Sequence, residues 1–151
     1  MFHMLPKMDE SRLMAGCGVI RSDSKNGNMN QGYNTSPSQG LIIMAGGFDD
    51  CVVELVDNTC TLARKDSEIF DIEDNRWYTG PTIPRGFKLG ESASLGDGSM
   101  VLVGGVDGFY NIKSDVIRLN PSLMEFETME EGLETARHSF GMAVLLDNEE
   151  C

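Results

Sequence analysis

The chain has 151 residues, of which 40% are hydrophobic and 17 are glycine, a composition typical of one globular domain. Its net charge of −12 argues against nucleic acid or anionic lipid as a partner, because an acidic surface repels phosphate. The longest apolar runs are about seven residues, whereas a membrane-spanning helix needs about 20, so no membrane span is predicted.

The first predicted strand covers residues 12–20, a run of small and apolar residues that starts at Arg12 and contains Gly16. Two later segments, 85–95 and 137–145, have the same form. In each case a basic residue, Arg85 or Arg137, precedes a glycine by four or five positions. Three occurrences indicate a repeated structural element.

A polar segment, residues 21–40, follows the first strand and contains almost nothing that a core would bury. Its composition of Ser, Asn, Gly, Gln, Asp and Pro predicts a loop. The counterpart in the second unit is only Gly96-Asp97-Gly98, a tight hairpin signal. We therefore interpret residues 21–40 as an insertion in a hairpin turn.

Two apolar runs, each closed by a pair of glycines, form the clearest repeat in the chain. They are residues 41–47, ending in Gly46-Gly47, and residues 100–105, ending in Gly104-Gly105. Neither run alternates apolar with polar residues, which predicts a strand covered on both faces. The glycines indicate a place where the backbone turns or approaches a neighbour closely.

The third and fourth strands of each unit are predicted at residues 68–72 and 76–78, and at residues 115–119 and 125–128. Setting Phe70 on Leu119 puts Trp77 on Phe126, so a large aromatic follows a turn at the same place in both units. A buried ring of this size would anchor packing between neighbouring sheets. The alternative for Trp77 is stacking on a ligand.

These features together resemble the kelch-repeat family. The two glycine pairs are 58 residues apart, and Gly90 and Gly141 in the later first strands are 51 apart, whereas kelch repeats have a period near ~50 residues. The resemblance also includes the aromatic spacing of Phe70 with Trp77, and it covers about residues 5–20 and 41–146.

The resemblance implies an all-β fold with two four-stranded kelch blades plus the first strand of a third, in an incomplete β-propeller. The expected organisation is 1–11 as the tail of a preceding blade, 12–84 as the first repeat with the inserted loop 21–40, 85–136 as the second repeat, and 137–151 as the start of a third. We expect a fragment of a larger propeller, whose terminal blades expose apolar sheet faces.

Kelch propellers mostly bind other proteins through loops on one rim, so the resemblance implies a protein–protein interaction module, such as a substrate-recognition or scaffold protein. The candidate contact residues are Phe109 and Tyr110, in the loop after the second glycine pair, and Arg85 near another loop. Adjacent aromatic residues beside a turn are plausible anchors. The alternative is that Phe109 or Tyr110 folds back over the blade edge.

No catalytic residue, cofactor, metal site or small-molecule ligand is predicted. The four cysteines form no CxxC pair, and His3 and His138 have no zinc-like spacing with them. Two alternatives stay open: a fragment of a kelch-type enzyme, and a secreted protein with a Cys51–Cys60 loop disulfide. Because a loop disulfide would indicate a secreted protein, the compartment, cytoplasmic or extracellular, also stays open.

Overall fold

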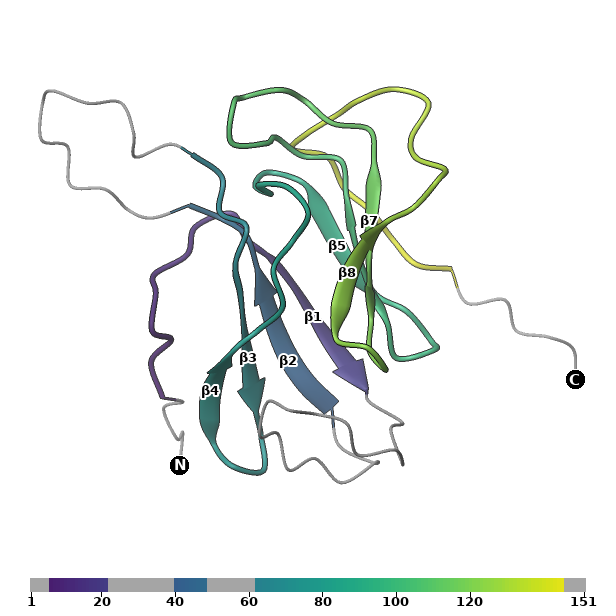
Figure 1. The fold of residues 1–151 in the computed structure, drawn as a ribbon. Helices are drawn as coiled ribbons and strands as arrows, with labels where there is room; N and C mark the ends of the chain where they lie inside the picture. Colours follow the sequence, from purple (N-terminus) through teal and green to yellow (C-terminus); the bar gives the residue numbers. More distant parts are fainter. Residues whose placement is uncertain (1–5, 22–39, 49–61, 146–151) are drawn as a thin grey trace, which may run out of the picture.

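The computed structural model describes residues 6–21, 40–48 and 62–145, which form two four-stranded antiparallel sheets (Figure 1). The first sheet has the order β1-β2-β3-β4 and the second β5-β6-β7-β8, so each is a simple meander. The strands are β1 (Gly16–Arg21), β2 (Gly40–Ala45), β3 (Ser67–Asp71), β4 (Arg76–Thr79), β5 (Glu91–Ser94), β6 (Met100–Val103), β7 (Val116–Asn120) and β8 (Glu125–Thr128). The described residues contain no helix that could cross a membrane. The all-β class is confirmed.

The two sheets are equivalent in register, as the aromatic spacing predicted. Phe70 pairs with Trp77 across β3 and β4, and Leu119 pairs with Phe126 across β7 and β8. The turns between these strands also match, because a side-chain oxygen of Asp71 and of Asn120 accepts two backbone N–H groups two and three residues ahead.

The predicted interruption of the first hairpin agrees with the strand pairing. Strands β1 and β2 are antiparallel, and their last pair is Arg21 with Gly40, so the ends of the inserted segment lie opposite each other. Residues 22–39 lie outside the described residues. In the second sheet the turn is tight, with the Leu95 N–H donating to the Ser99 carbonyl at 2.8 Å.

Both glycine pairs have left-handed backbone and contact the next part of the chain. All four residues have φ between 59° and 86°. The Gly47 N–H donates to the Phe87 carbonyl, and the Gly105 N–H donates to the Arg137 carbonyl, at 2.6 and 2.9 Å. The glycine pairs thus sit in equivalent surroundings, each joined to the segment that follows its own sheet.

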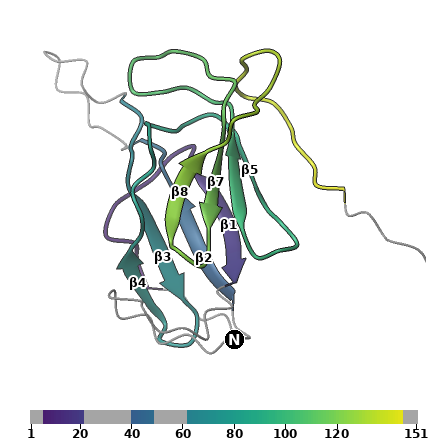
Figure 2. The ribbon, with the colours of Figure 1, turned by 45° about the vertical axis from the view of Figure 1, so that its right-hand side comes forward.

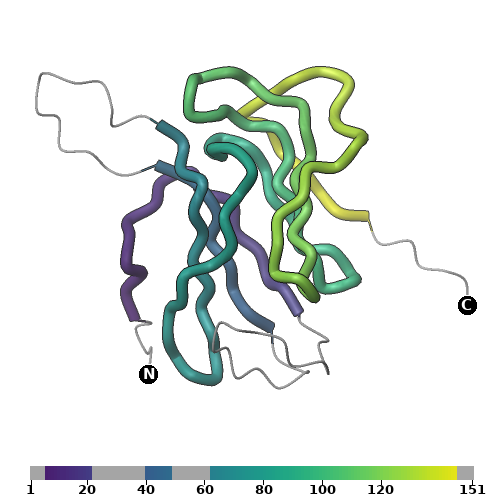
Figure 3. The backbone as a smooth tube through the Cα atoms, viewed as in Figure 1, coloured from purple at the N-terminus to yellow at the C-terminus, as the bar shows by residue number. Residues whose placement is uncertain are grey.

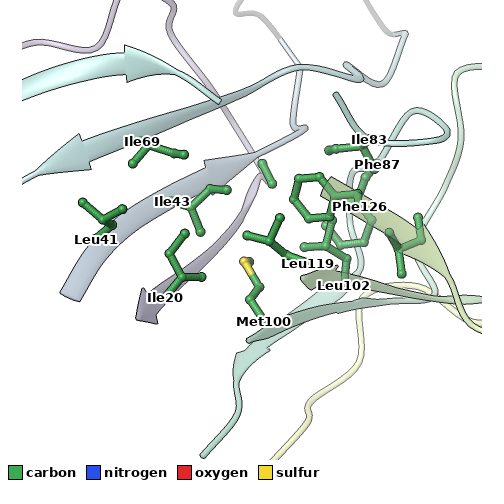
Figure 4. Packing of buried hydrophobic residues seen from close by; sticks show 12 residues of the cluster. Ile20, Leu41, Ile43, Ile69, Ile83, Phe87, Met100, Leu102, Leu119 and Phe126 are labelled. Atoms are coloured by element: carbon green, nitrogen blue, oxygen red, sulfur yellow. The ribbon is translucent and has the colours of Figure 1, made fainter. Parts of the chain in front are cut away.

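The hydrophobic core lies between the two sheets (Figure 4). One face of the first sheet packs against the opposite face of the second, and the connection between β4 and β5 closes the core with Ile83 and Phe87. The buried residues of the first sheet are Ile20, Leu41, Ile43, Ala45 and Ile69, and those of the second are Met100, Leu102, Ile117, Leu119 and Phe126.

Strands β1 and β5 are the closest parts of the two sheets (Figure 2). The Ser92 hydroxyl bonds both the N–H and the carbonyl of Cys17 at 2.9 Å, and the Ser94 hydroxyl accepts the Val19 N–H at 2.7 Å. These serines satisfy backbone groups on the open edge of β1, which would otherwise face solvent unpaired.

Three predicted strands differ from the structure. Strand β5 begins at Glu91 and leaves residues 85–90 outside it. Residues 12–15 precede β1 and lie outside it, with Leu13 making an isolated bridge to Phe48. Residues 137–145 form no strand. A strand needs a neighbour for its backbone N–H and carbonyl groups, and the described residues offer this segment no adjacent strand to pair with.

The outer faces of the sheets also differ from expectation. On β2, Leu41 and Ile43 are buried but Ile42 and Met44 on the other face are half-buried, so the strand is fully covered on one face. Trp77 lies on that outer face, where its ring packs on Phe70 at 5.2 Å between centroids and its indole N–H donates to the Pro6 carbonyl. Only its counterpart Phe126 packs between the sheets.

The free face of the second sheet is less apolar than expected. The register places Arg118 where the first sheet has the buried Ile69, and Glu127 where it has Tyr78. Arg118 is paired with Asp97, and its guanidinium also donates to the Ser99 hydroxyl. This face therefore combines charged residues with valines of β6.

Candidate protein-binding rim

Connections gather at one end of the molecule, which we call the upper rim (Figure 3). The rim consists of residues 12–15, 80–90, 104–115 and 129–140, which enter or leave the strands at the end where β1 and β5 begin. The tight turns β3–β4, β5–β6 and β7–β8 lie at the opposite end. The predicted contact residues Phe109, Tyr110 and Arg85 all belong to the rim.

Asp107 organises the loop that carries the two aromatic residues. Its Oδ1 accepts the N–H groups of Phe109 and Asn111, at 2.8 and 3.0 Å, and its Oδ2 pairs with the Lys113 ammonium at 2.8 Å. Burial raises the pKa of Asp107, but the bonds from Lys113 and Asn111 outweigh it and hold the pKa below its usual range. The loop is therefore fixed from within by an ionised carboxylate.

The two aromatic side chains have different surroundings. Phe109 is 85% exposed, so its ring does not fold back over the edge of the sheet. Tyr110 is 56% exposed and has φ of 62°, and the Lys88 ammonium lies 4.4 Å from its ring centroid. Burial lowers the pKa of Lys88, which also lies 5.3 Å from the centroid of Phe48. The Lys88 ammonium thus packs against the Tyr110 ring, while the Phe109 ring is exposed to solvent.

The Arg85 side chain makes its contacts within the fold and is not available to contact a partner. Its side chain is 14% exposed, and its guanidinium pairs with Asp115 and donates to the carbonyls of Gly104 and Gly86. All three guanidinium nitrogens are engaged. Their geometry fixes the glycine pair relative to the strand β7.

Arg12 makes the corresponding contacts in the first sheet. Its guanidinium donates to the Gly46 carbonyl at 2.9 Å and to Asp66 at 2.7 Å, and its side chain is fully buried. Asp66 and Asp115 are equivalent, because their carbonyls accept the N–H groups of Gly46 and Gly104. Arg64 and Arg12 hold the pKa of Asp66 well below its usual range. One structural network therefore occurs twice.

The predicted alignment of Arg85 with Arg12 and Arg137 is nevertheless off by two residues. Met14, Leu89 and Ser139 share a left-handed backbone, with φ of 55°, 58° and 51°, and mark equivalent positions. Two residues earlier stand Arg12, Phe87 and Arg137. Arg85 reaches its glycine carbonyl from a different place in the chain, since the buried Phe87 occupies the position of Arg12.

Replacing Arg85 with alanine should reduce the free energy of unfolding by about 1–3 kcal/mol, because Asp115 and the Gly104 carbonyl lose their donor. Arg137→Ala is the matched control, since among the described residues the Arg137 guanidinium makes one long hydrogen bond, 3.4 Å to the Thr135 carbonyl, and lies 6.0 Å from the Phe140 ring centroid; it should change stability by less than about 0.5 kcal/mol. Urea unfolding measures both. Equal, small effects would mean that the Arg85 network contributes nothing to the fold.

Further exposed apolar residues lie on the same rim and were not predicted as contacts. Leu13, Met14 and Ile112 are 43%, 55% and 48% exposed. Leu13 and Met14 belong to a segment that we predicted as a strand. The apolar pattern of that segment does not indicate that these two side chains are exposed. Ile112 directly follows the aromatic pair and Asn111, so its place in the loop was the available signal.

The remaining features of the sequence are its cysteines and its potential metal ligands. Cys51 and Cys60 lie outside the described residues, and Cys17 is an exposed free thiol. Within residues 6–21, 40–48 and 62–145, no group of three or more His, Cys, Asp or Glu side chains is placed to hold a metal ion.

Comparison with protein-family models and with curated proteins finds no match for this chain. The function must therefore be argued from the residues of the rim.

Proposed function

We propose that the chain is a kelch-type protein–protein interaction module that contacts its partner with the upper rim. The observation that carries the proposal is the exposure of Phe109, 85%, at the tip of a loop that hydrogen bonds hold in one shape. A large aromatic ring held in solvent by an ordered loop is available to fill a pocket on another protein.

The backbone of the same loop supports this assignment. Tyr110 has a left-handed conformation, which costs a non-glycine residue about 1–2 kcal/mol. Such strain persists only where the surrounding contacts enforce it, and it concentrates at functional sites. Here the Asp107 bonds and the Lys88 ammonium enforce it. Because the loop is preorganised, binding would cost little ordering entropy.

The propeller part of the proposal rests on the internal repeat. Two sheets of the same order and register pack one against the next, and each glycine pair contacts the following segment in the same way. Repeated sheets that stack in this manner are the building units of β-propellers, in which connections gather on one rim. The kelch assignment rests in addition on the glycine pairs and on the spacing of Phe70 and Trp77.

The proposal is tested by partner capture with the full chain, identification of the captured protein, and titration of that protein after purification. Phe109→Ala should weaken binding at least about tenfold, because an anchor residue contributes more than about 1.4 kcal/mol. Leu123→Ala is the control, since Leu123 is also exposed, 66%, but lies in the β7–β8 turn at the opposite end.

Circular dichroism and urea unfolding of both variants should match the unmodified chain, since neither side chain is buried. Equal affinity of the Phe109→Ala and Leu123→Ala variants for the partner would contradict the proposed binding surface.

A further inference from the structure

An open pocket of about 420 Å³ lies on the upper rim where the segments before β1 and β5 meet residue 139. The pocket is close to the loop that carries Phe109 and Tyr110. Leu89 lines the pocket, and the residue before it, Lys88, contacts the Tyr110 ring. The residues that matter for its chemistry are Met14, Cys17, Leu89, Glu91, Ser92 and Ser139. The pocket lies at the small end of the range for ligand sites, roughly 300–1,000 Å³, which suits a single side chain.

The backbone around the pocket is fixed by the repeat. The Leu89 N–H points to the Met14 carbonyl at 3.4 Å, and the Ser139 N–H donates to the Leu89 carbonyl at 2.8 Å. These three residues share the left-handed conformation that marks equivalent positions. The wall is therefore built from three successive copies of one backbone turn and does not depend on a flexible loop.

Glu91 is the departure from this repeat. It pairs with Val103, the residue before the second glycine pair, as Gly16 pairs with Ala45 before the first. A Cβ at Gly16 would lie 2.5 Å from a terminal methyl group of Leu102, so a side chain there would have to displace this buried residue. The second sheet carries Glu91 at the same position, and Glu91 is one of the residues that line the pocket.

Glu91 is a half-buried residue, and its side chain makes no hydrogen bond or ion pair with any other described residue. A cation that entered the pocket would give this carboxylate a charged hydrogen-bond partner.

We infer that this pocket binds a basic side chain, best a guanidinium, presented by the protein that the upper rim contacts. A carboxylate accepts two parallel N–H bonds from a guanidinium, which gives direction as well as attraction. The inference rests on the proposed function for the source of the side chain, whereas the binding chemistry rests on Glu91 alone.

The test is an NMR titration of the isotope-labelled full chain with N-acetyl-arginine amide. The amide signals of Gly90 and Ser92, which line the pocket, should shift and saturate. Glu91→Gln should weaken binding about tenfold or more, whereas Glu125→Gln, which changes an exposed carboxylate on β8, should leave it unchanged. N-acetyl-citrulline amide, which has the same shape without the charge, should not bind. Equal binding of both compounds, or no effect of Glu91→Gln, would overturn the inference.

The same variant separates this inference from the proposed function. With the purified partner, Glu91→Gln should weaken binding about tenfold. If Phe109→Ala abolishes partner binding and Glu91→Gln does not change it, the pocket inference is wrong and the proposed rim stands. If the arginine probe binds through Glu91 but Phe109→Ala leaves partner binding intact, the pocket stands and the proposed rim is wrong.

Discussion

Replacing Phe87 with alanine should lower the free energy of unfolding by about 3–5 kcal/mol, because the ring is fully buried in the core that both sheets share. The ring comes from the connection between β4 and β5 and approaches the glycines of both sheets. A Cβ added at Gly16 or at Gly90 would lie 3.1 or 2.6 Å from it.

Urea unfolding at 25 °C followed by circular dichroism measures this effect. The matched control is Phe109→Ala, which removes the same ring from a side chain that is 85% exposed and should change stability by less than about 0.5 kcal/mol. A loss below about 1 kcal/mol for Phe87→Ala would show that the two sheets do not depend on this ring for their packing.

Gly46→Ala should destabilise the chain by about 2–4 kcal/mol. The residue has φ of 70°, and the added Cβ would lie 2.3 Å from the Phe87 carbonyl oxygen, a separation that real atoms do not show. The left-handed backbone alone costs about 1–2 kcal/mol. The clash adds to this cost, because the carbonyl is held by the Gly47 N–H at 2.6 Å and cannot move freely.

Gly96→Ala is the control for the glycine experiment. A Cβ at Gly96 would meet nothing within 4 Å, and its φ is not in the left-handed region. Its thermal unfolding midpoint should stay within about 2 °C of the unmodified chain, whereas that of Gly46→Ala should fall by about 5 °C or more. Similar midpoints for both variants would contradict the assigned role of the glycine pair.

The sequence predicted those parts of the fold that short-range patterns determine. The spacing of Phe70 and Trp77 depends only on a hairpin of fixed length, so aligning it with Leu119 and Phe126 gave the correct strand pairing. The glycine pairs were equally informative, because left-handed backbone excludes most other residues.

Positions that depend on contacts between segments were not predictable in the same way. Arg85 was assigned by counting from a glycine, but the turn before β5 accommodates the buried Phe87, which moves the arginine out of register with Arg12. Its pairing with Asp115 is a long-range contact that no local pattern encodes. Phe109 and Tyr110 were found on the rim because they lie in the short loop after a glycine pair, separated from it by residues 106–108.

Glu91 was missed for a related reason. The sequence alignment set Gly90 on Gly141, whereas the shared backbone conformation at Leu89 and Ser139 sets Glu91 there. This shift by one residue hid the single charged side chain at a position that glycine otherwise occupies. Adjacent small residues make such errors common, since they fit a pattern of small residues in more than one register.

The position of Phe87 also bears on how the chain unfolds. Because each four-stranded sheet completes its core only with the other sheet and with the connection between them, neither sheet is an independent cooperative unit. A cleavage between β4 and β5 would remove the covalent link that keeps both halves of this core at high effective concentration. Both sheets should therefore melt in a single transition, and the halves of a cleaved chain should lose their structure together once they separate.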